Sequence, residues 1–296
     1  MIGRPQRRRL WFGLLTVLGL ARRGYFIPYR YAGMLPRAGT RPPYSAIEAL
    51  FATRESRFHE VLSWIDALAD DLTRIEAPPP EGASAGAALP EGRTPPPRWG
   101  QSWFPRLDAA LAYALLRRFE PRRVIEVGSG HSTRFLVRAG YDGGLATRIT
   151  AIDPAPRADP GSQAVDLRRV TVQEAGTGAF AELAAGDFLL IDSSHILMPG
   201  SDVDFLLGRV LPTLPAGVLV QLHDIFLPDD YPAAWAWRGY NEQLGVLSLL
   251  LGGGWEVLFA SHYAVTRMAR ALEASVIGRL PLPAGAIESS LWIKTR

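Results

Sequence analysis

The chain of 296 residues contains no cysteine, carries little net charge and has no apolar run long enough to cross a membrane. The lack of cysteine excludes disulfides, thiolate catalysis and cysteine-ligated metal sites, although it does not fix the compartment. The balance of 32 basic against 29 acidic residues is a formal charge of only +3, which gives little support to nucleic-acid binding. What remains is a globular chain, long enough for one α/β domain and an extension.

Much of the positive surplus lies near the N-terminus, around an apolar segment at Leu10–Ala21. A membrane span needs about 20 apolar residues, so this segment is too short. Arg22 and Arg23 stand where a signal peptide would have small residues before its cleavage site. The segment therefore predicts a helix that packs against its own protein or a sister subunit. The alternatives are a helix on a membrane surface and an uncleaved export signal. Because nothing later in the chain resembles a membrane segment, we expect a cytoplasmic protein, with peripheral membrane contact as the alternative.

Two segments precede the expected catalytic domain. Residues 45–48, Ser-Ala-Ile-Glu, have the form of a helix capping box, and apolar residues at intervals of seven predict one amphipathic helix over 45–75. Its apolar stripe needs a partner, either the main domain or a second subunit, so a homo-oligomer is one prediction. Residues 77–98 are rich in proline and glycine, which predicts a linker or surface loop. The chain thus divides into a helical extension at 1–76, this linker, and a catalytic domain at 99–296.

The catalytic domain is organised around residues 124–135, which read Val-Ile-Glu-Val-Gly-Ser-Gly-His-Ser-Thr-Arg-Phe. The short β-branched run ends abruptly at Gly128-Ser129-Gly130, so the segment predicts a buried parallel strand, a turn and a helix. Glycine lets the backbone approach a ligand closely, and Ser129 or Ser132 can cap a helix whose free N–H groups face that ligand. A tight turn without a ligand is the alternative.

A second strand is expected at 148–152 and is followed by Asp153 and Pro154. Asp153 lies 25 residues beyond Gly128. A carboxylate at this distance, at the end of the neighbouring strand, suits the ribose hydroxyls of a nucleoside ligand. An Asp-Pro turn without a ligand is the alternative. The pairing of a glycine-rich turn with this acid predicts nucleoside binding more specifically than either feature alone.

Polar and titratable residues gather where the expected strands stop. Further strands are predicted at Arg169–Glu174, Asp187–Asp192, Gly217–Leu222, Trp255–Ser261 and Ser289–Lys294, with a helix at Asp202–Leu211. In an open α/β sheet the ligand crevice lies at the carboxyl ends of the strands. We therefore expect one rim to collect Glu126, Asp153, Asp192, His195, His223 and Asp224. Two histidines beside carboxylates at strand ends favour a functional site over a structural one.

This order of strands resembles the class I S-adenosylmethionine-dependent methyltransferases, and the turn at 126–130 is similar to their first motif. The sequence Asp-Ser-Ser-His at 192–195 and the sequence His-Asp-Ile-Phe-Leu-Pro at 223–228 are similar to small-molecule O-methyltransferase-like proteins related to macrolide-sugar methyltransferases. The resemblance covers about residues 99–296. It implies an α/β fold, with a Rossmann-like, seven-stranded, mostly parallel sheet whose last strand is antiparallel. It also implies transfer of a methyl group from S-adenosyl-L-methionine to a small-molecule hydroxyl, with no nucleic-acid partner.

The resemblance implies a set of cofactor-binding residues: Glu126, Gly128, Ser129, Gly130, Ser132, Thr133, Asp153, Pro154, Gln173, Glu174, Asp192 and Ser193. Glu126 and the turn would meet the methionine moiety, with Ser132 and Thr133 near its carboxylate. Asp153 would hold the ribose, and Gln173 or Glu174 would lie near the adenine.

The implied chemistry is an in-line displacement, in which a hydroxyl loses its proton while it attacks the sulfonium methyl group. His195 is the first candidate base and His223 the second, with Asp192 facing the methyl group. Alternatively, Mg²⁺ or another divalent metal at Asp192, His223 and Asp224 would lower the pKa of the hydroxyl. The sequence departs from the family at His131, where many members have a third glycine, and it offers fewer carboxylates than the metal-dependent relatives.

Two other classes of protein stay open. An NAD-dependent oxidoreductase shares the strand, the turn and the ribose acid, although His131 replaces a small residue that would suit a pyrophosphate. A non-catalytic nucleoside-binding or membrane-associated scaffold would use the basic N-terminus. The concentration of titratable groups at one rim favours an enzyme over this scaffold.

Overall fold

The computed structural model describes residues 4–75, 95–156 and 164–296. The chain forms two compact units. The N-terminal unit comprises Met1–Pro43 and Asp229–Tyr240, and the sheet unit comprises Tyr44–Pro228 and Asn241–Arg296. Residues 45–75 belong to the unit that contains the sheet, so the boundary expected at residue 76 does not separate the two units. The expected linker lies outside the described residues except for its last four.

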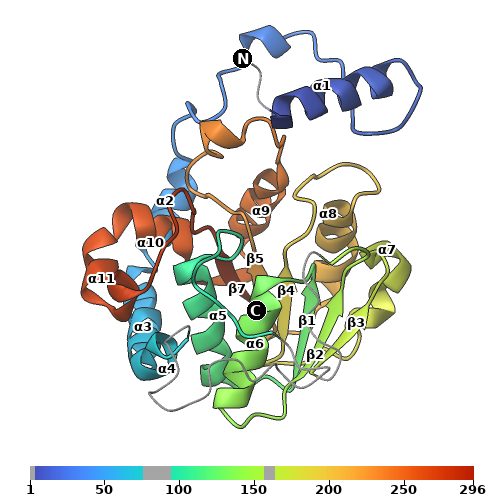
Figure 1. Cartoon of the computed structure of the whole chain (residues 1–296). Helices are drawn as coiled ribbons and strands as arrows, with labels where there is room; N and C mark the ends of the chain where they lie inside the picture. Colours follow the sequence, from blue (N-terminus) through green and yellow to red (C-terminus); the bar gives the residue numbers. More distant parts are fainter. Residues whose placement is uncertain (1–3, 76–94, 157–163) are drawn as a thin grey trace. The chain divides into compact units, whose positions relative to one another are not determined.

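A seven-stranded sheet forms the centre of the sheet unit (Figure 1). Its strands are β1 (Arg123–Val127), β2 (Arg148–Ile152), β3 (Val165–Arg168), β4 (Phe188–Ile191), β5 (Leu219–Leu222), β6 (Trp255–Ala260) and β7 (Leu291–Thr295). Their order is β3-β2-β1-β4-β5-β7-β6, and only the two pairs that involve β7 are antiparallel. The predicted mostly parallel sheet with an antiparallel last strand is confirmed. The strand order reverses between β1 and β4, which is where such a sheet has its ligand crevice.

The helices of the sheet unit are α2 (Ser45–Ala52), α3 (Glu55–Asp66), α4 (Ala69–Thr73), α5 (Arg106–Phe119), α6 (His131–Asp142), α7 (Val172–Ala175), α8 (Asp202–Phe205), α9 (Glu242–Leu251), α10 (Ser261–Arg267) and α11 (Ala269–Ala274). Helices α5 and α6 pack side by side (Figure 1). Helix α8 continues as a π turn at Leu206–Val210 and a 3₁₀ turn at Leu211–Thr213, so only the first turn of the expected helix is regular.

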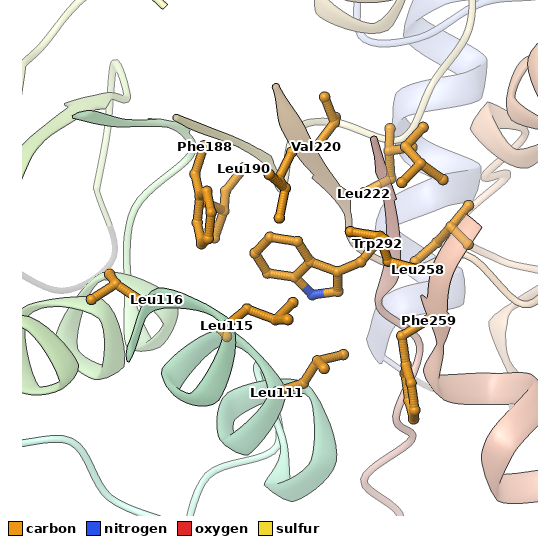
Figure 2. Close-up of a cluster of buried hydrophobic side chains, with 14 of the residues drawn as sticks. Leu111, Leu115, Leu116, Phe188, Leu190, Val220, Leu222, Leu258, Phe259 and Trp292 are labelled. Atoms are coloured by element: carbon orange, nitrogen blue, oxygen red, sulfur yellow. The ribbon is translucent and has the colours of Figure 1, made fainter. Parts of the chain in front are cut away.

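The core lies between α5 and the sheet. Figure 2 shows the Trp292 indole of β7 between the Leu111 and Leu115 side chains of α5 and the apolar side chains of β4 and β5. The Trp292 and Phe188 rings meet edge to face, with centroids 5.4 Å apart. Leucines four residues apart share one face of a helix, which is why α5 turns this stripe toward the strands. The core therefore fixes the carboxyl ends of β4 and β5, where the site residues follow.

The prediction of a strand at Arg169–Glu174 was wrong. Strand β3 ends at Arg168, and the next residues form helix α7 instead. Thr171 caps this helix by accepting a hydrogen bond from the Glu174 N–H, and the Glu174 carboxylate accepts one from the Thr171 N–H at 2.8 Å. This is a Thr-x-x-Glu capping box, which specifies a helix start even before so short a helix.

The single long helix expected at 45–75 is also wrong. The segment forms α2, α3 and α4, and Tyr44 rather than Ser45 precedes the first of them. Glu48, the expected capping-box partner, instead pairs with Arg267 at 3.0 Å. The apolar stripe nevertheless exists, because Phe51, Phe58, Ile65 and Leu72 are fully buried in the core of the same chain. The main domain is thus the partner of the stripe, and this stripe gives no support to an oligomer.

The N-terminal unit contains helix α1 (Arg4–Val17). Leu10, Trp11 and Leu14 of this helix are each more than half exposed. The structure therefore does not show the apolar side chains of this helix packed in a core. Within the described residues, no helix is both long and apolar enough to span a membrane.

Candidate active site

The glycine-rich turn leaves the carboxyl end of β1 and enters α6. Gly128 has a φ of +90°, and a Cβ there would lie 2.2 Å from the backbone oxygen of Asp192, so only glycine fits. Gly130 has an extended φ, and a Cβ there would meet no atom of the described chain within 4 Å. The fold itself therefore requires Gly128, whereas the space beside Gly130 is open to a ligand.

Asp153 follows β2 and lies against this turn. Its Oδ2 accepts a hydrogen bond from the Ser129 N–H at 2.9 Å and lies 3.3 Å from Ser129 Oγ. Its Oδ1 accepts a hydrogen bond from the Ala155 N–H at 2.8 Å. The acid and the turn are thus in direct contact at the switch point, with Pro154 exposed next to them.

Glu126 of β1 is buried under the start of α6. Its carboxylate accepts hydrogen bonds from the Ser132 and Thr133 hydroxyls. Burial raises the pKa of Glu126 to about 7, since the two hydroxyl donors only partly offset the loss of water. Because both hydroxyls are occupied, an anion at this helix end would meet the N–H groups of its first turn.

Six titratable side chains meet beyond β4 and β5, and we name them the rim cluster. Its members are Asp108, Asp192, His195, His223, Asp224 and Glu242. Four of these are the strand-end residues expected at the site. Asp108 comes from α5 and Glu242 from the start of α9.

His195 is held between three carboxylates. Its Nδ1 lies 2.8 Å from Glu242 Oε2, and its Nε2 lies 3.3 Å from Asp192 Oδ1 and 3.5 Å from Asp224 Oδ2. Glu242 is completely buried, so its contact with Nδ1 fixes the ring while Nε2 points to Asp192. The Asp192 side chain is 41% exposed, whereas that of His195 is 4% exposed. Asp192 therefore marks the point at which the rim cluster opens to solvent.

His223 also lies near three carboxylates. Its Nδ1 lies 3.5 Å from both Asp192 Oδ1 and Asp224 Oδ1, and its Nε2 lies 3.5 Å from Asp108 Oδ2. These distances are long for hydrogen bonds, and neither buried ring nitrogen has a hydrogen-bond partner among the described residues. The ring also packs against Phe104, with centroids 5.3 Å apart.

The backbone is strained at two members of the rim cluster. His195 has a φ of +61° and Asp224 a φ of +55°, a region that residues with a Cβ seldom occupy. Such conformations persist only where the surrounding structure enforces them, and they are most frequent at functional sites. Here the two strained residues lie close together, with His195 Nε2 3.5 Å from Asp224 Oδ2.

The carboxylates set the charge of the two imidazoles. Burial lowers the pKa of His195, but its contacts with Asp192 and Glu242 outweigh burial and raise that pKa well above its usual value. The charges of Asp224 and Asp192 likewise outweigh burial and raise the pKa of His223. Burial raises the pKa of Asp192, but the two imidazoles together hold it well below its usual range. These shifts favour the cationic form of both rings in the free protein.

Sequence reasoning missed Asp108 and Glu242. Asp108 accepts hydrogen bonds from the Ser289 and Ser290 N–H groups at 2.9 and 3.0 Å, so it also ties α5 to the start of β7. The available signal was a lone acid within an otherwise apolar helix face, because such an acid needs a buried partner. Glu242 gave a weaker signal, since its role depends on a fold that returns α9 to the end of β4.

The structure does not bring Gln173 and Glu174 to the rim cluster. Gln173 donates a hydrogen bond to the Gly200 carbonyl at 3.1 Å, and Glu174 caps α7. Ser193, in contrast, follows Asp192 directly and has a buried hydroxyl without a hydrogen-bond partner among the described residues.

The rim cluster offers a partial fit to a divalent metal. The unpartnered His223 nitrogens, close to Asp192 and Asp224, are a donor set that suits a softer ion better than Mg²⁺, which prefers oxygen. Yet no group of three or more such side chains in the described residues is arranged as a metal site. Asp192, His223 and Asp224 could hold a metal only after their side chains shift.

The strand order, the glycine-rich turn and the acid after β2 define a class I, Rossmann-like methyltransferase fold. Residues 125–225, about a third of the chain, match the family model described as a methyltransferase domain. The segment from β1 to β5 is thus similar to a methyltransferase domain. No curated protein matches the chain.

The solved structures to which this chain is similar have low sequence identity to it. The methyltransferase PaMTH1 of Podospora anserina, bound to S-adenosylhomocysteine, is 15% identical, with coverage of 92% of this chain and 99% of its own and a TM-score of 0.41. TomG of Streptomyces achromogenes, an O-methyltransferase of tomaymycin synthesis bound to S-adenosylmethionine, is 13% identical, with coverage of 80% and 89% and a TM-score of 0.40. MycE of the mycinamycin pathway, bound to Mg, S-adenosylhomocysteine and mycinamycin VI, is 16% identical, with coverage of 61% and 47% and a TM-score of 0.36.

Proposed function

We propose that the protein methylates a hydroxyl group of a small molecule, and that His195 is the base positioned by Glu242. The observation that carries this proposal is the 2.8 Å contact between His195 Nδ1 and a fully buried glutamate, which leaves Nε2 at the opening marked by Asp192. A carboxylate on one ring nitrogen fixes the tautomer and orientation that the other nitrogen needs to accept a proton.

The cofactor would lie along the ends of β1, β2 and β4. The open space beside Gly130 suits its methionine moiety, and Asp153 keeps oxygen lone pairs for the ribose hydroxyls while it braces the turn. Ser193 contributes an unpartnered hydroxyl beside Asp192. The contacts of Gln173 and Glu174 give no support to an adenine-binding role for these two residues.

Bound S-adenosylmethionine would supply an electrophilic methyl group. At the rim cluster, His195 Nε2 would accept the proton that the acceptor hydroxyl loses when its oxygen takes the methyl group. This role requires a neutral ring. A sulfonium cation at the rim would disfavour the imidazolium and so lower the pKa of His195. Asp192, the exposed carboxylate, would face that cation.

Metal assistance is the second form of this proposal. Asp192 and Asp224, with His223, would hold a divalent ion that lowers the pKa of the acceptor hydroxyl. The unpartnered His223 nitrogens support it. Dialysis against a chelator, followed by single-metal addition, distinguishes the two forms: activity that returns only with metal supports assistance, and unchanged activity excludes it.

Two variants test the base. His195→Ala should lower turnover by about 10² to 10⁴, the usual contribution of a general base, and Glu242→Gln should lower it by at least about tenfold. Turnover is measured as S-adenosylhomocysteine release with a panel of phenolic and sugar hydroxyl acceptors. His59→Ala, on the exposed face of α3, is the control. Isothermal titration should show unchanged cofactor affinity in all three variants, and unchanged turnover of His195→Ala would remove this residue from the mechanism.

Titration with NAD tests the alternative that the protein is an NAD-dependent oxidoreductase. Burial and the nearby Arg134 and Arg98 charges lower the pKa of His131 to about 4, so a neutral ring stands where a pyrophosphate would need a glycine. We expect heat of binding with S-adenosylmethionine and none with NAD; the reverse would assign the turn to a dinucleotide. Binding of S-adenosylmethionine without turnover on any acceptor would support the non-catalytic scaffold.

A further inference from the structure

We propose that the N-terminal unit binds the surface of an anionic lipid membrane. Two independent properties of this unit support the assignment: a concentration of exposed apolar side chains, and a large excess of arginines over acids. Neither property is used by the methyl-transfer site.

The apolar side chains are concentrated in one short segment. Of the twenty large hydrophobic side chains that are exposed in the described residues, thirteen lie between Leu10 and Leu35. They are Leu10, Trp11, Leu14, Val17, Leu18, Leu20, Tyr25, Phe26, Ile27, Tyr29, Tyr31, Met34 and Leu35, each at least 51% exposed. A single exposed leucine is ordinary, but a cluster of this size marks an interaction surface.

The charge of the same segment is entirely positive. Residues 1–47 contain nine arginines and no aspartate, glutamate or lysine, whereas residues 48–296 contain 23 basic and 29 acidic residues. An anionic surface would therefore attract residues 1–47, whereas residues 48–296 carry a net negative charge. Arg8 and Arg23 lie over the Phe12 ring, at 5.0 and 6.0 Å from its centroid. Mixed arginine and aromatic side chains are typical of the boundary between lipid headgroups and acyl chains.

The segment is held in a defined unit rather than left as a free tail. Asp230 forms a bidentate ion pair with Arg41 and accepts a hydrogen bond from the Gly39 N–H at 2.8 Å. The side chain of Asp230 is only 4% exposed. Arg9 donates a hydrogen bond to the Ala236 carbonyl at 3.0 Å. Residues 229–240 thus anchor the basic segment while its leucines and aromatic residues stay exposed.

A second copy of the chain is a poorer occupant of this surface. A two-fold interface places the same patch on both sides, so the ten arginines of one unit would face ten arginines, with only Asp229 and Asp230 of each copy as carboxylates. Nucleic acid would satisfy the arginines but not the aliphatic Leu10, Leu14, Val17 and Leu18. A bilayer offers both anionic headgroups and an apolar layer, and the segment is too short to cross it.

Vesicle flotation of the full chain tests the proposal. We expect flotation with vesicles of phosphatidylcholine containing 30% phosphatidylglycerol, and at least tenfold weaker partition onto pure phosphatidylcholine or onto the anionic vesicles at 0.5 M salt. The variant Leu10→Ser/Leu14→Ser/Leu18→Ser and the variant Arg8→Gln/Arg22→Gln/Arg23→Gln should each lose at least tenfold in partition.

Matched controls use exposed residues of the sheet unit: Tyr141→Ser/Leu251→Ser/Leu282→Ser and Arg209→Gln/Arg270→Gln/Arg279→Gln. Both should float as the unmodified chain does, and S-adenosylmethionine affinity should stay the same in all four variants. Absence of flotation, equal loss in variants and controls, or concentration-dependent self-association that replaces vesicle binding would each overturn the proposal. Binding to a mixed-sequence DNA duplex, with no flotation, would overturn it in favour of nucleic acid.

Discussion

Two glycines in one turn have different physical reasons for being glycine. Gly128 combines a positive φ with a near contact to the Asp192 carbonyl, so its requirement comes from the protein. Gly130 faces open space, so any requirement there comes from a ligand. The motif as read in the sequence does not distinguish these two reasons, because both residues are simply glycine in a turn.

This difference predicts opposite outcomes for two alanine substitutions. Gly128→Ala should destabilise the fold by at least about 2 kcal/mol, because of backbone strain and the forced shift of the Asp192 backbone. Gly130→Ala should change stability much less but weaken S-adenosylmethionine binding at least tenfold. Urea unfolding and calorimetric titration of both variants give the answer. Full cofactor affinity in Gly130→Ala would show that the cofactor does not pass over this residue.

Glu126 should make stability depend on pH. Burial raises its pKa to about 7 in the folded protein, above its usual 4.5. A raised carboxyl pKa stabilises the fold at pH values below 4.5, and this contribution is lost as the pH rises through 7. Relative to Glu126→Gln, the unmodified protein should therefore lose about 3 kcal/mol of unfolding free energy between pH 4.5 and 8.

Urea unfolding of both proteins at several pH values measures this difference. The exposed Glu273→Gln provides the control, and its profile should run parallel to that of the unmodified chain. Parallel profiles for Glu126→Gln as well would mean that Glu126 titrates normally in the folded state.

At the scale of elements, α2, α3 and α4 show that a correct hydrophobic pattern does not fix where helices end. The seven-residue spacing of Phe51, Phe58 and Ile65 did identify a buried face. It did not reveal the breaks near residues 53 and 67, because a helix can restart in register with its apolar stripe. Nor did it reveal that α3 packs on α5 and β6 of its own chain.

Phe58→Ala should consequently destabilise the sheet unit by about 3–5 kcal/mol, the cost of a large cavity in a core. The Phe58 ring is fully buried and meets Phe51, Phe259 and Tyr263 at centroid distances of 5.1 to 6.4 Å. Chemical denaturation measures the loss, with the neighbouring Glu60→Ala as a surface control. A loss below 1 kcal/mol would show that this helix is not part of the cooperative core.

Helix α7 shows the opposite error, in which the hydrophobic pattern predicted the wrong type of element. A β-branched run favoured a strand at 169–174, yet the capping box formed by Thr171 and Glu174 decides for a helix start. The capping box was readable in the sequence. At this position the signal for a helix start therefore outweighs the short β-branched run.

At the scale of the whole molecule, charge is divided between two parts of the chain. Residues 1–47 are strongly basic, and the remainder is net acidic. The small net charge conceals this division. Conclusions drawn from the net charge alone would miss that one segment of the chain is strongly basic.

The sequence by itself determined the sheet, the glycine-rich turn and most of the polar residues at the strand ends. Hydrophobic pattern and backbone preference act over a few residues, and the parallel order then places all carboxyl ends at one edge. Only the tertiary structure decided which side chains touch. Asp108 lies 115 residues from its neighbour His223, and Glu242 lies 47 residues from its neighbour His195. Both reach the rim cluster because α5 and α9 fold back against the ends of β4 and β5. Contacts between distant segments depend on packing, and packing has no local signature in the chain.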